Sequence, residues 1–155
     1  MTEQHQQPQQ PQQPTPNPGA VPPPGAAPVG ATPPTEMAPG DQKTMGMLAH
    51  LIPLAAMYLS AGTLGFVASI VMWALTKDRG AFVAHHARNS LNVQLTTLIA
   101  YVVAVVLAFT IILIPVSIVL ALVALVASTV IHIIAAIKAA NGEWYRPPLM
   151  LELIK

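Results

Sequence analysis

The sequence contains no cysteine and very little charge. Without cysteine the chain cannot form disulfides, thiolate nucleophiles or cysteine-ligated metal centres. Only 8% of its 155 residues are Asp, Glu, Lys or Arg, whereas about 25% is typical of soluble domains. A net charge of +1 supplies no basic face, so we expect no nucleic-acid partner. The 54% of hydrophobic residues instead indicates a protein in contact with membrane lipid.

The N-terminal segment differs in composition from the rest of the chain. Twelve of the sixteen prolines lie in residues 1–40, and seven glutamines lie between Gln4 and Gln13. No apolar run in this segment is long enough to nucleate a core. We therefore predict a disordered, Pro/Gln-rich cytoplasmic tail over 1–42, which is either a solvated extension or a docking ligand for a soluble partner.

Two long stretches without a charged residue define the membrane domain. One comprises 33 residues between Lys43 and Lys77, and the other comprises 49 residues between Arg88 and Lys138. As single helices they would measure about 50 and 74 Å, against a hydrocarbon core of about 30 Å. Each stretch is therefore predicted to form a helical hairpin rather than one span.

Each predicted hairpin contains a helix breaker near its middle. Ser60-Ala61-Gly62 interrupts the first stretch, and Ile114-Pro115 interrupts the second. The predicted fold is all-α, a polytopic membrane domain over 43–140 with four transmembrane helices arranged as two hairpins. These spans are expected near residues 44–59, 63–76, 90–113 and 116–138.

The positions of the positive charges agree with four spans. Lys43, the loop from Lys77 to Arg88 and the tail with Arg146 then share one face, which the positive-inside rule makes cytoplasmic. Both termini are therefore expected in the cytoplasm. A three-span alternative, in which 44–76 crosses once, would place Lys43 on the opposite side and require a steep tilt.

Aromatic residues mark the expected cytoplasmic interface. Trp73 lies near the inner end of the second span, and Trp144 and Tyr145 follow the fourth, as expected of anchors in an aromatic belt. Asn141-Gly142 is a helix stop, because glycine readily adopts the left-handed conformation that closes a last turn. Residues 141–155 are predicted to form a cytoplasmic interfacial tail.

A polar stripe leads into the third span. On a helical wheel His85, Arg88, Asn89 and Asn92 fall within an arc of about 100°, beside an aliphatic arc. The stripe is either a solvated collar near lipid phosphates or a polar groove that contacts a substrate or another subunit.

Two histidines are expected deeper in the membrane. His50 lies about two turns into the first span, and His132 lies about two turns from the inner end of the fourth. Their similar depth allows them to approach one another. They are either structural residues hydrogen-bonded between helices or a proton-linked pair. A metal site is less favoured, because no carboxylate lies inside the spans to complete a ligand set.

Catalytic patterns are missing from the sequence. It has no phosphate-binding glycine loop, no His-Glu-x-x-His and no Gly-x-Ser-x-Gly motif. The six carboxylates all lie outside the predicted spans, and none is spaced as an acid/base pair. We expect no catalytic residue, no bound metal, no cofactor and no enzymatic activity.

Three segments resemble a widespread bacterial family of small four-span membrane proteins of unknown function. They are MGMLAHLIPL (45–54), WALTKDRGAFVAHHARNSLNVQLT (73–96) and IIAAIKAANGEWYRPPL (133–149). That family is distantly similar to the four-span subunit of the chloroplast inner-envelope protein-import (Tic) translocon. The resemblance covers about residues 43–155 and implies that Asn92, Gln94 and Gly142-Glu143-Trp144 are characteristic positions. It adds Gln94 to the candidate contact groove. Pro147 departs from the family pattern, which tends to carry an aromatic residue there.

These observations favour a non-enzymatic protein of the bacterial plasma membrane. We expect an accessory or scaffolding subunit that associates with other membrane subunits or with its own copies. The resemblance implies a link to protein translocation. The alternative is a small homo-oligomeric channel or proton-coupled transporter that uses His50, His132 and the polar stripe.

Overall fold

The structure, a computed structural model, describes residues 36–155. Most of the predicted disordered tail over 1–42 lies outside the described residues and stays a prediction. The first helix begins at Pro39, so the last four residues of that predicted tail are helical. Proline fits the first helical turn because its missing N–H has no intrahelical acceptor there.

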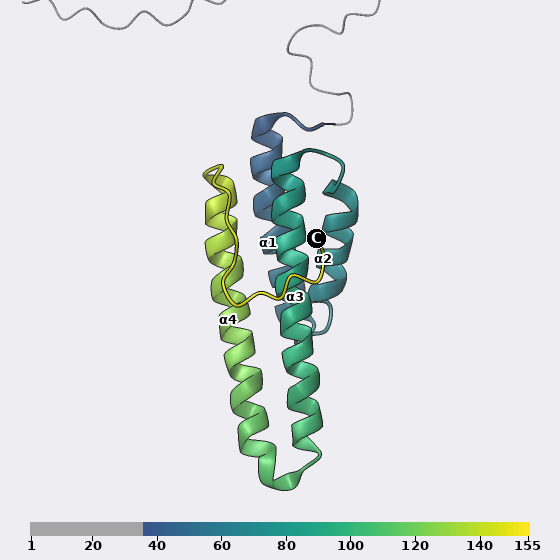
Figure 1. Cartoon of the computed structure of the whole chain (residues 1–155), viewed down its shortest axis with the longest axis vertical. Helices are drawn as coiled ribbons and strands as arrows, with labels where there is room; N and C mark the ends of the chain where they lie inside the picture. Colours follow the sequence, from purple (N-terminus) through teal and green to yellow (C-terminus); the bar gives the residue numbers. More distant parts are fainter. Residues whose placement is uncertain (1–35) are drawn as a thin grey trace, which may run out of the picture. The chain divides into compact units, whose positions relative to one another are not determined.

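The described residues form four α-helices and contain no strand, in agreement with the predicted all-α class. The helices pair as two hairpins along the chain (Figure 1). Their bounds are α1 Pro39–Leu59, α2 Gly65–Thr76, α3 Ala81–Ala108 and α4 Ile114–Ala140, with a short 3-10 helix, η1, over Ile111–Leu113.

Helix α3 departs most from its predicted span of 90–113. It begins nine residues earlier, directly after Gly80, whose φ of +138° is rarely adopted by other residues. It ends at Ala108, because Thr110 has an extended backbone before η1 begins. The polar stripe predicted as a lead-in therefore lies within the first half of a continuous 28-residue helix.

Small side chains allow α1, α3 and α4 to pack closely. Ala49 of α1, Ala87 of α3 and Ala135 and Ala139 of α4 are all completely buried. Helix α1 packs against each of the other three helices. Because lipid provides little hydrophobic drive for helix association, close approach through small residues is the main source of packing energy in a bilayer.

The α1–α2 hairpin is shorter than the α3–α4 hairpin (Figure 1). Its turn lies against Tyr101 of α3, since a Cβ on Gly62 would be 3.1 Å from the Tyr101 ring. Between Arg88 and Tyr101 α3 rises about 20 Å, whereas between Arg88 and Ala108 it rises about 30 Å, the thickness of a hydrocarbon core. When α3 and α4 cross a bilayer, the α1–α2 turn therefore lies inside it.

Several backbone N–H groups of the α1–α2 turn are hydrogen-bonded within the turn itself. The Gly62 N–H donates to the Met57 carbonyl at 2.6 Å, and the Leu64 N–H donates to Ser60 Oγ at 2.8 Å. The Thr63 N–H donates to the Ser60 carbonyl at 3.3 Å. Lipid offers no partner for an exposed N–H, so this internal bonding is what a turn within a bilayer requires.

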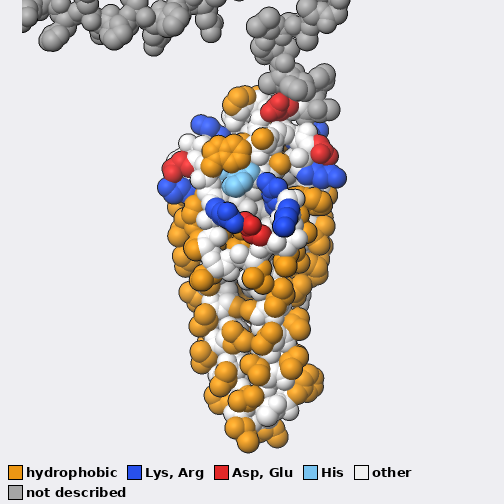
Figure 2. Space-filling model, viewed as in Figure 1, with side chains coloured by type: hydrophobic (Ala, Val, Ile, Leu, Met, Phe, Trp, Pro, Cys, Tyr) orange, Lys and Arg blue, Asp and Glu red, His pale blue; other side chains and the backbone are white. Residues whose placement is uncertain are grey.

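The surface separates charge from hydrocarbon. Lys, Arg, Asp and Glu side chains gather at one end of the helical domain, and apolar side chains cover the rest of the visible face (Figure 2). We call these the charged end and the far end. The far end carries η1, where Ile111 and Ile112 are more than 80% exposed. Exposed aliphatic surface of this extent indicates contact with lipid.

Among the described residues, two helical segments are long and apolar enough to cross a membrane, Ala81–Ala108 and Ile111–Ala140. Helix α2 has only 12 residues, and α1 does not reach the same length and apolarity. The four full crossings expected from the sequence are therefore not confirmed. We expect instead that α1 and α2 enter the bilayer and return at the Gly62 turn.

Single cysteines test the depth of this turn, because the native chain contains none. We expect Ile112→Cys and Asp78→Cys to react with an impermeant thiol reagent from opposite sides of the membrane. Ala61→Cys should react at least tenfold more slowly than Ile112→Cys from either side, because lipid surrounds the turn. Equal rates for Ala61→Cys and Ile112→Cys from one side would establish four full crossings instead.

Candidate functional site

Three buried histidines from three helices form a hydrogen-bonded row at the charged half of the domain. His50 of α1, His86 of α3 and His132 of α4 have no exposed surface. His50 Nδ1 lies 3.3 Å from His132 Nδ1, and His50 Nε2 lies 3.3 Å from His86 Nδ1. The predicted approach of His50 to His132 is confirmed, and His86 joins them on the other side of the His50 ring.

Each end of the row is closed by an amide group of the chain. The Gln94 side-chain nitrogen lies 3.2 Å from His132 Nε2. At the other end His86 Nε2 lies 3.1 Å from the backbone carbonyl oxygen of Glu143. Every ring nitrogen of the three histidines therefore has a polar partner, as burial in an apolar medium requires.

The Glu143 carbonyl fixes the direction of the whole row. A carbonyl oxygen can only accept, so His86 Nε2 must carry the hydrogen. In a neutral ring Nδ1 of His86 then accepts from His50 Nε2, and Nδ1 of His50 accepts from His132 Nδ1. His132 Nε2 is left as an acceptor, and the Gln94 amide nitrogen is the donor that meets it. One set of neutral tautomers thus satisfies all four bonds.

We call this set, Gln94, His132, His50, His86 and the Glu143 carbonyl, the imidazole row. The two nitrogens of His50 point to different neighbours, so the three rings cannot converge on one ion. Within residues 36–155 no group of three or more His, Cys, Asp or Glu is arranged to hold a metal. The arrangement instead suits the storage or transfer of a proton between adjacent rings.

The motif that anchors Glu143 closes the end of α4. The Glu143 N–H donates to the Lys138 carbonyl and the Gly142 N–H donates to the Ala139 carbonyl, with Gly142 at a φ of +77°. This is the Schellman arrangement, and it confirms the predicted helix stop at Gly142. The Glu143 side chain accepts from Lys138 Nζ at 2.6 Å, and this bond holds the pKa of Glu143 below its usual value.

The polar stripe of α3 binds the chain's own C-terminal segment, residues 143–155. The Tyr145 carbonyl oxygen lies 3.0 Å from His85 Nε2 and 2.8 Å from Asn89 Nδ2. Asn92 Oδ1 accepts from the Leu153 and Ile154 N–H groups at 3.2 and 2.8 Å. Asn92 Nδ2 also donates to the Ile154 carbonyl at 2.9 Å. These hydrogen bonds therefore hold the C-terminal segment in place across α3.

The other predicted positions divide between these two arrangements. Gln94 turns away from the stripe into the imidazole row. Arg88 takes no part in holding the C-terminal segment, although it borders the space beneath it. Sequence reasoning missed His86, although its spacing from Ser90 and Gln94, at i, i+4 and i+8, places all three along one side of α3.

The expected interface aromatics lie at the charged end. Trp73 lies beneath Lys77, whose Nζ is 5.4 Å from the ring centroid. Trp144 packs edge-on against Phe82 and His85 at centroid distances of 5.2 and 5.0 Å, and it stays 61% exposed. A half-packed, half-exposed indole at this end fits the predicted role of an interfacial anchor.

The sequence model of the magnetosome magnetite crystal formation protein family matches residues 41–154. This finding supports the expected resemblance to a family of small bacterial membrane proteins. It does not support similarity to the chloroplast translocon subunit. No curated protein and no solved structure matches the chain.

The tautomers of the imidazole row can be read directly by ¹⁵N NMR of histidine-labelled protein at neutral pH. We expect His132 to carry its hydrogen on Nδ1, and His50 and His86 to carry theirs on Nε2, because only this pattern meets a terminal carbonyl. A histidine side chain in water prefers Nε2–H, so His132 is the informative ring. A His132 ring with its hydrogen on Nε2 would contradict the row.

Proposed function

The chain belongs to the magnetosome magnetite crystal formation protein family, and from this membership we propose that it is a non-enzymatic subunit of a membrane complex. It associates with a partner helix inside the bilayer. The observation that carries this proposal is an open apolar groove of about 710 Å³ toward the far end, below the short α1–α2 hairpin.

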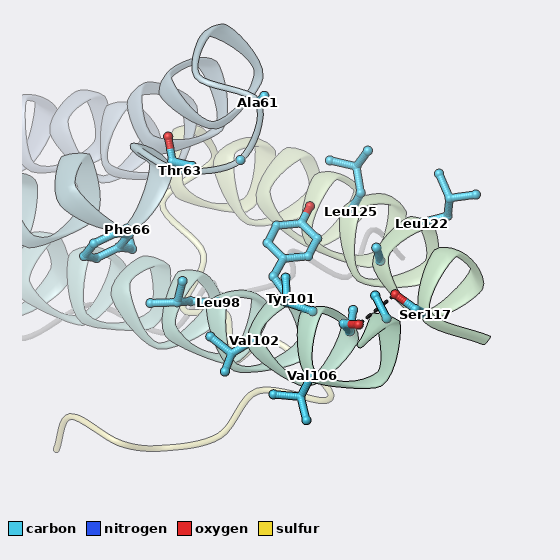
Figure 3. Close-up of a pocket in the computed structure, with 15 residues that line it drawn as sticks. Ala61, Thr63, Phe66, Leu98, Tyr101, Val102, Val106, Ser117, Leu122 and Leu125 are labelled. Carbon is cyan, nitrogen blue, oxygen red and sulfur yellow. Dashed lines mark hydrogen bonds between the residues drawn. The ribbon is translucent and has the colours of Figure 1, made fainter. Parts of the chain in front are cut away.

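The groove exists because α1 and α2 stop short of the far end. Its floor is formed by α3 and α4, and its upper edge by the α1–α2 turn and Phe66 of α2 (Figure 3). The lining side chains are apolar apart from the hydroxyls of Thr63, Tyr101 and Ser117. Ser117 donates to the Ala104 carbonyl at 2.7 Å, so its hydroxyl is already satisfied.

An apolar helix of another subunit fits the chemistry of this groove. Ala104, Ala108 and Ala121 line it, and small side chains let a neighbouring backbone approach closely where lipid gives no hydrophobic drive. No charged residue lies along the groove, so the partner helix is apolar as well. The partner is a second copy of this chain or a different membrane subunit, and the experiment below separates the two.

The family description names magnetite crystal formation. The residues of the far-end turn bear on whether this chain contacts the mineral itself. The far-end turn over 109–113 contains no carboxylate and no imidazole, and oxygen and nitrogen ligands are what iron requires. Among the described residues, charge is confined to the other end. We therefore place the role of this chain in organising the membrane rather than in contacting a mineral.

Membrane orientation follows from the basic residues. Helices α3 and α4 cross, the α1–α2 hairpin returns, and the charged end with both termini faces the cytoplasm by the positive-inside rule. A location in the bacterial plasma membrane and a soluble partner for the Pro-rich tail stay predictions. Four complete crossings are the alternative to a returning hairpin, and the reactivity of Ala61→Cys separates the two. The link to protein translocation rests on the resemblance alone.

Matched cysteines test the groove. Val106→Cys lines it and Val119→Cys does not, yet both native valines are 60% exposed on the far half. We expect oxidative crosslinking in membranes to trap Val106→Cys at least fivefold more efficiently. With tagged and untagged copies, a mixed dimer identifies a second copy, whereas an adduct of another defined mass identifies a different subunit. Val106→Cys that stays monomeric, or equal capture at both sites, would contradict association through the groove.

The imidazole row supports a second candidate, a proton-coupled transporter or channel. Its three linked rings can move a proton within the charged half, but beyond Gln94 the groove is lined mainly by hydrocarbon. We therefore favour association. Proton flux in proteoliposomes that disappears with His50→Ala or His132→Ala would favour transport, and the absence of flux in the native chain would remove it.

A further inference from the structure

A small polar pocket lies between α3 and the C-terminal segment at the charged end. Its volume is about 280 Å³, and it exists because the segment crosses the polar stripe rather than packing flat against it. The pocket is bordered by Arg88 and Asn89 of α3 and by Arg146, Glu152 and Lys155 of the segment. None of these charged groups takes part in the imidazole row or in the groove.

The charge around the pocket is unbalanced. Three cationic side chains face one carboxylate, because Arg88, Arg146 and Lys155 border the pocket with Glu152. Glu152 pairs with Arg146, which fixes that guanidinium on one side. Arg88 and Lys155 form no ion pair within the described part of the chain. Two cations are therefore available to an anion that enters.

The pocket lies at the charged end of the domain (Figure 2), where the headgroups of a surrounding bilayer are expected. Basic side chains and Glu surround a histidine on this face, directly above the apolar surface (Figure 2). The same segment carries Leu149 and Leu151, which are 86% and 49% exposed. Exposed leucines on a segment that also carries basic residues are typical of a segment lying at a membrane interface, with its apolar side chains in the lipid.

We propose that this pocket binds a phosphate group, and that its source is the headgroup of an anionic lipid. Arg88 can present the planar guanidinium fork that matches phosphate oxygens, and Lys155 adds a point charge. Arg146, held by Glu152, adds positive charge to the same side of the pocket. Asn89 and Asn92 are occupied by the backbone of the C-terminal segment, so they shape the pocket rather than bind. The proposal goes beyond association in the groove and does not depend on it.

A bound phosphate would link the C-terminal segment to α3. Arg88 lies on the helix, whereas Arg146 and Lys155 lie on the segment, so one anion between them bridges the two. Lipid binding and docking of the segment would then support each other, because each is favoured when the other has occurred. A membrane without anionic lipid would leave the cations facing one another across the pocket.

The experiment uses the full chain in neutral detergent, titrated with phosphatidylglycerol or phosphatidylcholine and followed by native mass spectrometry. We expect at least a fivefold preference for phosphatidylglycerol. Arg88→Gln should weaken that binding about fivefold, since one cation near an anionic surface contributes about 1 kcal/mol. Arg79→Gln removes a cation at the same end but outside the pocket, and it should leave the affinity unchanged.

The two sources of phosphate are separated by competition. Phosphatidylglycerol binding that survives millimolar inorganic phosphate identifies the lipid. Binding of inorganic phosphate alone, lost in Arg88→Gln, identifies a free-phosphate site instead and overturns the lipid assignment. Equal binding of both lipids, or equal losses in Arg88→Gln and Arg79→Gln, would overturn the pocket altogether. Lys155→Gln, whose side chain makes no bond that holds the fold, repeats the test if Arg88→Gln does not fold.

Discussion

The structure depends on one constraint, that polar groups buried among lipid-facing helices must find partners inside the protein. The imidazole row meets this constraint with side chains from three helices and one backbone carbonyl. Because each neutral ring donates once and accepts once, removing any ring leaves two buried groups without a partner. The row therefore specifies how α1, α3 and α4 meet, in a way that interchangeable alanine contacts cannot.

The same constraint applies to the α1–α2 turn and to the C-terminal segment. Ser60 and neighbouring carbonyls bond the N–H groups of Gly62, Thr63 and Leu64 in the α1–α2 turn, which lowers the cost of placing that turn in a bilayer. Because the α1–α2 hairpin is short, no third helix covers the far half of the α3–α4 pair, and the groove lies there. At the charged end Asn92 satisfies the backbone of Leu153 and Ile154, and the crossing segment encloses the basic pocket. The domain therefore divides into a charged half held together by polar contacts and a far half whose apolar groove is the proposed site of association.

Much of this architecture could be predicted from the sequence. The gaps between charges predicted two hairpins, the Gly142 stop was confirmed, and equal depth brought His50 together with His132. The shorter reach of α1 and α2 could not be predicted, because an apolar run does not encode how far its hairpin enters the membrane. The partners of Asn92 could not be predicted either, because they are backbone groups of Leu153 and Ile154. Every residue carries such groups, so the sequence does not distinguish these two. The part of His86 in the row was not predicted, because the polar stripe that contains His85 lies on a different face of α3.

The three imidazoles are hydrogen-bonded to one another rather than merely adjacent. A double-mutant cycle on His50→Leu and His132→Leu tests this most directly. The free energy of unfolding in mixed micelles would be measured for both single variants and the double variant. We expect a coupling energy of about 0.5–3 kcal/mol, because the double variant loses their shared bond only once. The pair His85→Leu and His132→Leu, which shares no hydrogen bond, should be additive within about 0.5 kcal/mol. Additive effects for His50 and His132 would contradict the account.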